Sequence, residues 1–254
     1  MLPLRQSLAR TSNQRLHHHA AASAPRSNMA CLRQATEDAR LGAPGDVILI
    51  GGASLADFRV RDAQSHARHD LTPSHWSLVA ILDDNDELLT VPLSPIPDAS
   101  RVPPSNAIVA LPLSAFDDPV VYPNFGILRF PADGPRVLQR ARGLRRQRTI
   151  VDLPQLLLAW LGYAWGTSGS ANPLINGLGV PSAAFVETAF GMADVELTPG
   201  LASGSSCPEA IWQAARWWHD FYAESAGVAG DAEANVPIGW WVVRQGRASY
   251  IVPK

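Results

Sequence analysis

Two points along the chain place a nucleophilic side chain at the start of a predicted helix. Ser182 follows Pro181 in an apolar helical pattern, and Cys207 precedes the pattern that begins at Pro208. Unpaired amides and the helix dipole lower the pKa of a thiol in such a position, whereas a serine needs a neighbouring base. His75, beside a predicted strand, is the candidate base. The same pattern also allows Ser182 to be an ordinary cap and Cys207 a small buried residue.

Other titratable clusters lack the spacing of a metal site. Four acidic residues share one predicted turn: Asp83, Asp84, Asp86 and Glu87. They lack the length and the terminal glutamate of an EF-hand, so a solvated turn is favoured. His66, His69 and His75 have neither cysteine partners nor the H-E-x-x-H spacing. Two cysteines, Cys31 and Cys207, are too few for a disulfide framework or a structural zinc site. We therefore expect no metal and no cofactor.

The elements that must position these residues are mostly strands in the first half of the chain and helices in the second. Apolar runs bounded by turn residues predict strands over 47–50, 76–82, 87–93, 107–113 and 125–130, and a closing hairpin from 240–243 and 249–252. Helical spacing and cap residues predict helices over 27–41, 134–149 and 208–222, with others starting at Asp152 and Pro181. This order predicts an α+β fold in which a small mixed or antiparallel sheet packs on helices.

Three motifs, taken in order, resemble the circularly permuted branch of the NlpC-type, papain-like cysteine peptidase and amidase superfamily. They are Gly45-Asp46-Val47-Ile48-Leu49, Trp76-Ser77-Leu78-Val79-Ala80-Ile81 and Pro181-Ser182-Ala183-Ala184-Phe185-Val186-Glu187. The resemblance spans roughly residues 45–223. It implies a permuted papain-like fold with a catalytic histidine on the second motif's strand. It also implies a nucleophilic cysteine at the start of the third motif's helix and an acyl-enzyme intermediate.

The sequence departs from that pattern at the residues that carry the chemistry. Ser182 stands at the cysteine position and Leu78 at the histidine position, although a shifted register brings in His75. Thr90 is the polar residue on the next strand that would orient a base. The resemblance therefore implies a catalytically degenerate protein that acts as a binding or structural subunit. The alternative is an active hydrolase, an amidase or peptidase that cleaves peptidoglycan-type or acyl-amide bonds through Ser182 or Cys207.

The start of the chain differs in composition from the rest. No acidic residue precedes Glu37, arginines and serines are frequent, and three histidines follow one another at 17–19. The segment lacks the apolar h-region of a secretory signal and resembles either an organellar transit peptide or an arm that docks on a partner. We expect a flexible or partner-docking arm over residues 1–28 and a single domain over residues 29–254. The pairs Trp217-Trp218 and Trp240-Trp241 are each expected to expose one ring as a contact surface for a protein partner.

Composition sets the remaining expectations. The 254 residues are 46% hydrophobic and 17% charged, which suffices for a sizeable core, and the net charge of −2 gives no sign of nucleic-acid binding. No apolar run approaches the ~18 residues of a membrane-spanning helix. The absence of a secretory signal and the two cysteines favour the cytoplasm, with an organellar or translocated location as the alternative. A cleft ligand would be a peptide or an acyl-amide. The basic helix over 134–149 is either a solvated face or a site for a phosphate, a lipid head group or an acidic partner.

Overall fold

The computed structural model describes residues 27–39, 41–93, 107–147, 153–167, 169–229 and 239–244. Several sequence predictions concern residues outside this set. They are the arm up to residue 26 with its three histidines, the Asp152 helix cap, and the second half of the closing hairpin at 249–252. None of the described helices is both long and apolar enough to cross a membrane.

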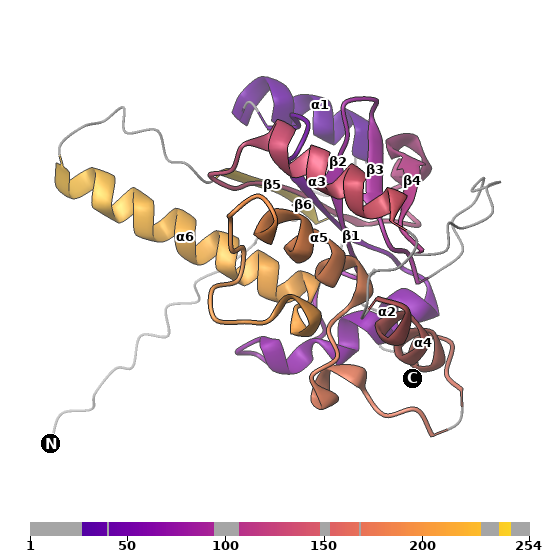
Figure 1. Ribbon diagram of the computed structural model, residues 1–254. Coiled ribbons are helices and arrows are strands. Elements are labelled where there is room, and N and C mark those ends of the chain that lie inside the picture. The colour runs from indigo at the N-terminus through magenta and orange to yellow at the C-terminus, as the bar shows by residue number, and fades with distance from the viewer. Residues whose placement is uncertain are drawn as a thin grey trace, which may run out of the picture.

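A six-stranded antiparallel sheet forms the centre of the molecule (Figure 1). Its strands are β1 (Val47–Gly51), β2 (Leu78–Leu82), β3 (Glu87–Thr90), β4 (Val109–Pro112), β5 (Asn124–Arg129) and β6 (Gly239–Arg244). They lie in the order β4-β3-β2-β1-β5-β6, and each neighbouring pair is antiparallel. The predicted α+β class with a sheet packed on helices is therefore confirmed, and β4, within the strand predicted over 107–113, lies at one edge of the described sheet.

The helices mostly begin where the sequence places their start signals. They are α1 (Asn28–Ala39), α2 (Leu55–Ala63), α3 (Gly134–Arg146), α4 (Leu153–Ala164), α5 (Pro181–Gly191) and α6 (Pro208–Ala229), with short 3-10 helices η1 (Ser65–Ala67), η2 (Leu113–Phe116), η3 (Pro173–Asn176) and η4 (Ser203–Ser205). Ser54 and Asp133 cap α2 and α3 by accepting from the backbone nitrogens of Asp57 and Arg136. The prediction that the last long helix ends at residue 222 is wrong, because α6 continues to Ala229.

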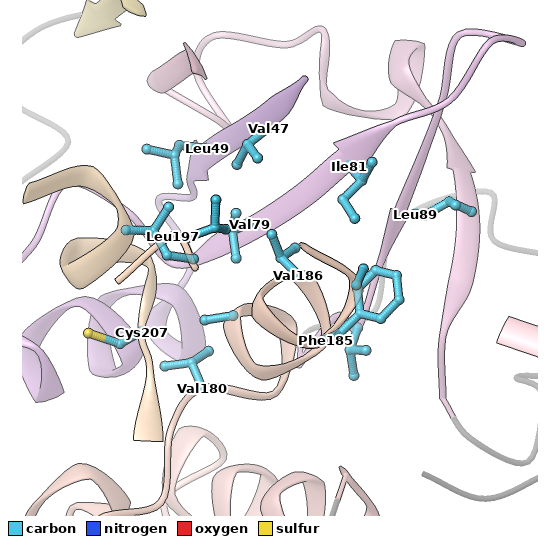
Figure 2. Packing of buried hydrophobic residues seen from close by; sticks show 14 of the residues in the cluster. Val47, Leu49, Val79, Ile81, Leu89, Val180, Phe185, Val186, Leu197 and Cys207 are labelled. Carbon is cyan, nitrogen blue, oxygen red and sulfur yellow. The ribbon is translucent and has the colours of Figure 1, made fainter. Parts of the chain in front are cut away.

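Alternating strand residues divide the core into two parts, one on each face of the sheet. Val47, Leu49, Val79 and Ile81 face the larger part, to which α2, α3, α4, α5 and α6 contribute; Figure 2 shows these side chains opposite Val186 of α5. The other face packs against α1 and η2 through a second group: Leu32, Ile48, Ile50, Leu78, Phe116, Tyr122 and Phe125. The period of two along each strand thus decides which helix a residue meets.

The Gly45-Asp46 motif has a packing explanation. Gly45 has φ +93°, and a Cβ on it would lie 2.4 Å from the Cα of Gly134 at the start of α3. The Asp46 carboxylate accepts two hydrogen bonds from Arg129 of β5, at 2.8 and 2.7 Å, and one each from the backbone nitrogens of Gly42 and Ala43. Together these two residues fix the entry of the chain into β1 against β5 and α3.

Candidate functional site

Ser182, the candidate nucleophile, is closed off from solvent. It lies in the first turn of α5 and has an exposed fraction of 0%. Its Oγ accepts a hydrogen bond of 3.3 Å from the backbone nitrogen of Val79 in β2. The interpretation of Ser182 as the helix cap is wrong, because Val180 occupies the N-cap position. Ser182 instead joins α5 to the sheet.

Thr90, the candidate orienting residue, binds the same residue of β2. Its Oγ1 donates a hydrogen bond of 2.7 Å to the carbonyl oxygen of Val79. The paired residues of β2 and β3 are Ile81 with Leu89 and Leu82 with Leu88, so the pairing stops short of Val79. In an antiparallel sheet the N–H and C=O of one strand residue point to the same side. The side chains of Ser182 and Thr90 therefore take the place of the backbone hydrogen bonds that a paired strand would make with Val79. The positions that the resemblance assigns to a nucleophile and an orienting residue thus meet at the backbone of Val79.

The position assigned to the catalytic histidine lies on the other face of the sheet. Leu78 packs in the second part of the core with Ile50 and Phe116, away from α5. His75 lies before β2 and is half-buried, with its ring centroid 6.2 Å from that of Trp76. Its backbone carbonyl oxygen packs closely on Gly51, 1.9 Å from the position that a Cβ on that glycine would take. The structure therefore does not gather the predicted residues into one hydrogen-bonded group, since the hydroxyl of Ser182 is bonded to Val79 instead.

Cys207, the other candidate nucleophile, lies in the larger part of the core (Figure 2). Its exposed fraction is 4%, and it directly precedes α6. Burial raises the pKa of its thiol to about 12, and the nearby carboxylates of Glu209 and Glu187 add to the increase. Burial therefore outweighs the effect of the helix N-terminus, and Cys207 is a protonated thiol at neutral pH.

Two buried glutamates that we did not single out in the sequence join the helices to their loops. Glu209 has an exposed fraction of 0% and accepts hydrogen bonds of 2.6 Å from Ser74 and from Gln213. Glu187 of α5 accepts from Thr198 at 2.6 Å and from Ser206 at 2.9 Å. Burial raises the pKa of Glu187 above its ordinary value, although these hydrogen bonds act in the opposite direction.

A small pocket of about 30 Å³ lies at the end of the sheet where β1 ends and β2 begins. Its walls are mostly apolar: Ile50, Val60, Leu78, Pro92, Leu93 and Phe116. Three polar side chains complete the lining, Asp57 from α2, Ser77 from the start of β2 and Tyr122 from the segment before β5. This volume is room for about two water molecules and is far below the roughly 300–1,000 Å³ of a usual small-molecule site.

The hydrogen bonds among the polar groups of this pocket have defined donors and acceptors. The Ser77 hydroxyl donates to Asp57 Oδ1 at 2.8 Å and accepts from the backbone nitrogen of Gly52 at 3.1 Å. The Ser54 hydroxyl donates to Asp57 Oδ2 at 2.5 Å. Tyr122 is 9% exposed, and its hydroxyl forms no hydrogen bond within the described part of the chain. Burial, followed by the charge of Asp57, raises the pKa of Tyr122 above 10, so its hydroxyl stays protonated.

This pocket was missed in the sequence because its polar residues belong to three separate segments. The Ser54-x-x-Asp57 spacing is a helix-start signal and could have pointed to Asp57 as a cap residue. Nothing in the local sequence marks Ser77 or Tyr122 as its neighbours.

The acidic turn and the basic helix contact each other. Arg142 of α3 pairs with Asp83 and Asp84 of the acidic turn, and Arg136 pairs with Asp194. The solvated-turn interpretation holds for Asp84 and Asp86, which are exposed, whereas Asp83 is buried against α3. Among the residues that the structure describes, no group of three or more His, Cys, Asp or Glu side chains could hold a metal ion.

Exposed aromatic side chains lie on α6. Trp217 is 57% exposed and stacks on Phe221, with 5.5 Å between ring centroids and 15° between ring planes. Trp218 is half-buried and packs against the larger part of the core. The expectation that one ring of this pair faces outward is thus met, whereas the side chains of Trp240 and Trp241 lie outside the description.

Comparisons with models of protein families, with curated proteins and with solved structures each found no match.

Proposed function

We propose that the chain is a catalytically degenerate protein of the permuted papain-like, NlpC-type architecture, which acts by binding and not by hydrolysis. The observation that carries this proposal is the closed position of Ser182, whose hydroxyl is buried and bonded to the Val79 nitrogen. A nucleophile must reach a substrate carbonyl and share a proton with a base. Ser182 meets neither condition in this arrangement.

The relation of α5 to the sheet supports the architectural part of the proposal. In the resemblance, the helix that starts with the nucleophile faces the strand of the histidine. Here α5 packs against β2, through Val186 opposite Val79, and Thr90 of β3 completes the group. The nucleophile and orienting positions thus lie together at Val79, whereas Leu78, at the histidine position, faces the other side of the sheet.

The alternative function is an active amidase or peptidase that forms an acyl-enzyme through Ser182 or Cys207, with His75 as base. The raised pKa of Cys207 disfavours the thiol route. A structural subunit, held by the arm over residues 1–28 and by the exposed Trp217, is the remaining candidate and is compatible with a degenerate site.

Activity-based labelling separates these functions. The purified protein is treated with a fluorophosphonate and with a chloroacetamide, natively and in urea, and the modified residues are mapped by mass spectrometry. We expect no labelling of Ser182 in the native protein, and labelling of Cys207 only after unfolding. At pH 8, a thiol with a pKa of about 12 is ionised in about one molecule in 10⁴. Rapid native labelling of either residue that is lost in His75→Ala would instead establish the amidase.

A further inference from the structure

We infer that a cavity beside the C-terminal end of α5 binds a primary ammonium group on a short alkyl stem, the chemistry shared by a lysine side chain and a free alkylamine. The cavity measures about 380 Å³ and lies between α5 and the segment over 195–203. This volume is within the range of usual small-molecule sites. Neither Ser182 nor Cys207 lines it, so the inference goes beyond the proposed function and does not depend on it.

The floor of the cavity carries a buried carboxylate without a counter-ion. Glu187 is 5% exposed and lines the cavity together with Thr198, which is also buried. Its Oε1 accepts from the hydroxyls of Thr198 and Ser206, at 2.6 and 2.9 Å. Within the described part of the chain, no basic side chain forms an ion pair with Glu187. Because a buried charge is costly unless it is paired, a cation in the cavity would supply the missing partner.

Other parts of the lining also favour positive charge. Glu196 adds a second carboxylate at the exposed rim, and the described lining contains no arginine, lysine or histidine. Gly191, the last residue of α5, belongs to the lining as well, which places the negative end of the helix dipole at the cavity. A buried carboxylate, an exposed carboxylate and a helix C-terminus therefore act together on any ligand in this cavity.

The arrangement favours an ammonium over a guanidinium group. Because Oε1 of Glu187 already accepts two hydrogen bonds, the carboxylate does not offer two free oxygens to the planar fork of a guanidinium. An ammonium is a compact charge with three donors in different directions, so it can bind one carboxylate oxygen and backbone carbonyls together. Val195 and Leu201 supply apolar surface for the alkyl stem.

NMR titration of the full chain at pH 7 with butylamine, butan-1-ol and butylguanidine tests the inference. The three probes share one alkyl stem and differ only in the head group. We expect butylamine to bind at least about tenfold more tightly than butan-1-ol and about threefold more tightly than butylguanidine. It should shift the amide signals of Gly191 and Gly200, which both line the cavity.

A fourth probe, Nα-acetyl-lysine amide, distinguishes the two sources of the ammonium group. An affinity above that of butylamine identifies a lysine residue of a peptide or protein, because its backbone then adds contacts. An equal or lower affinity identifies a free alkylamine.

Two variants locate the charge that the ligand meets. Glu187→Gln keeps an acceptor oxygen, removes the charge and should weaken butylamine binding about tenfold or more. Glu196→Gln should weaken it about 2- to 3-fold, since an exposed charge is screened by solvent. The matched control is Glu37→Gln, which removes a charge from the exposed side of α1 on the opposite face of the sheet and should leave binding unchanged.

The inference is overturned if butan-1-ol or butylguanidine binds as tightly as butylamine, if no probe binds, or if both cavity variants bind butylamine like Glu37→Gln. Should Glu187→Gln fail to fold, the comparison of Glu196→Gln with Glu37→Gln decides. Rapid native labelling of Ser182 or Cys207 by the activity probes would contradict the proposed function and would leave this assignment intact.

Discussion

At the scale of single residues, the side chains that suggested catalysis stabilise the sheet. Ser182 and Thr90 supply an acceptor and a donor to Val79, just beyond the last described pair of β2 and β3. A buried N–H without an acceptor is costly, so an acceptor is required at this point whether or not the protein has an activity. A polar residue at the start of α5 can thus be explained by structure alone.

Replacing Ser182 by alanine should therefore act on stability. The Val79 nitrogen loses its acceptor in the core, and we expect the free energy of unfolding to fall by about 1–3 kcal/mol. Urea denaturation followed by circular dichroism measures this change. Ser114→Ala, at an exposed position of η2, is the control and should stay within about 0.5 kcal/mol of the wild type. Unchanged stability of Ser182→Ala would contradict the role assigned to this hydroxyl.

Replacing either of two glycines, Gly45 and Gly143, by alanine should change the stability in opposite directions. Gly45→Ala forces a Cβ to within 2.4 Å of Gly134 at a positive φ, and should lower the free energy of unfolding by about 2 kcal/mol or more. Gly143 lies inside α3 with open space around its Cα. Gly143→Ala should raise the stability by about 0.5–1 kcal/mol. The melting temperatures of the two variants should thus move in opposite directions, and a shift in the same direction would refute this explanation of the motif.

At the scale of elements, buried carboxylates hold helices to the segments beside them. Glu209 at the start of α6 binds Ser74 and Gln213, and its backbone nitrogen donates to Gln64 at 2.9 Å. Glu187 of α5 binds the loop that leads to α6 through Thr198 and Ser206. The two helices that carry the candidate nucleophiles are therefore fixed by polar contacts as well as by their apolar faces.

Glu187 should make the stability depend on pH. Burial raises its pKa in the folded protein above the ordinary value near 4.5, so the folded state retains the proton longer than the unfolded state does. Its contribution is fully present below pH 4.5 and is lost as the pH rises through the folded pKa. Glu187→Gln keeps an acceptor oxygen and does not ionise. The melting temperature of this variant, relative to the wild type, should increase between pH 4 and pH 8.

The neighbouring Glu196 provides the control for that pH profile. It is exposed in the loop that follows α5. The melting curve of Glu196→Gln against pH should run parallel to that of the wild type. A Glu187→Gln profile that also runs parallel would show that Glu187 ionises equally in both states.

At the scale of the whole molecule, helices cover both faces of one sheet (Figure 1). The face that carries Ile48 and Ile50 is covered by α1, through Leu32. The side chain of Asn28 anchors this helix by donating to the carbonyl oxygens of Phe116 at 2.7 Å and Tyr122 at 2.9 Å. The domain therefore includes α1 from its first residue.

Two truncations test this domain boundary. Removal of residues 1–26 leaves the described contacts in place and should change the free energy of unfolding by less than about 0.5 kcal/mol. Removal of residues 1–40 uncovers Ile48 and Ile50 and should cost at least about 3 kcal/mol or prevent folding. Urea denaturation of both proteins gives the comparison. Equal stability of the two would show that α1 is not part of the domain.

The sequence by itself determined most of the elements, their order and the antiparallel hairpin of β2 and β3, because apolar periodicity, caps and turns are local signals. Only the tertiary structure decided what Ser182, Cys207 and Tyr122 can do. Whether a hydroxyl is closed off, whether a thiol is ionised and whether Asp57 meets Ser77 depend on packing between segments far apart in the chain. The continuation of α6 to Ala229 was not evident in the sequence, which carries only a weak helical pattern beyond residue 222.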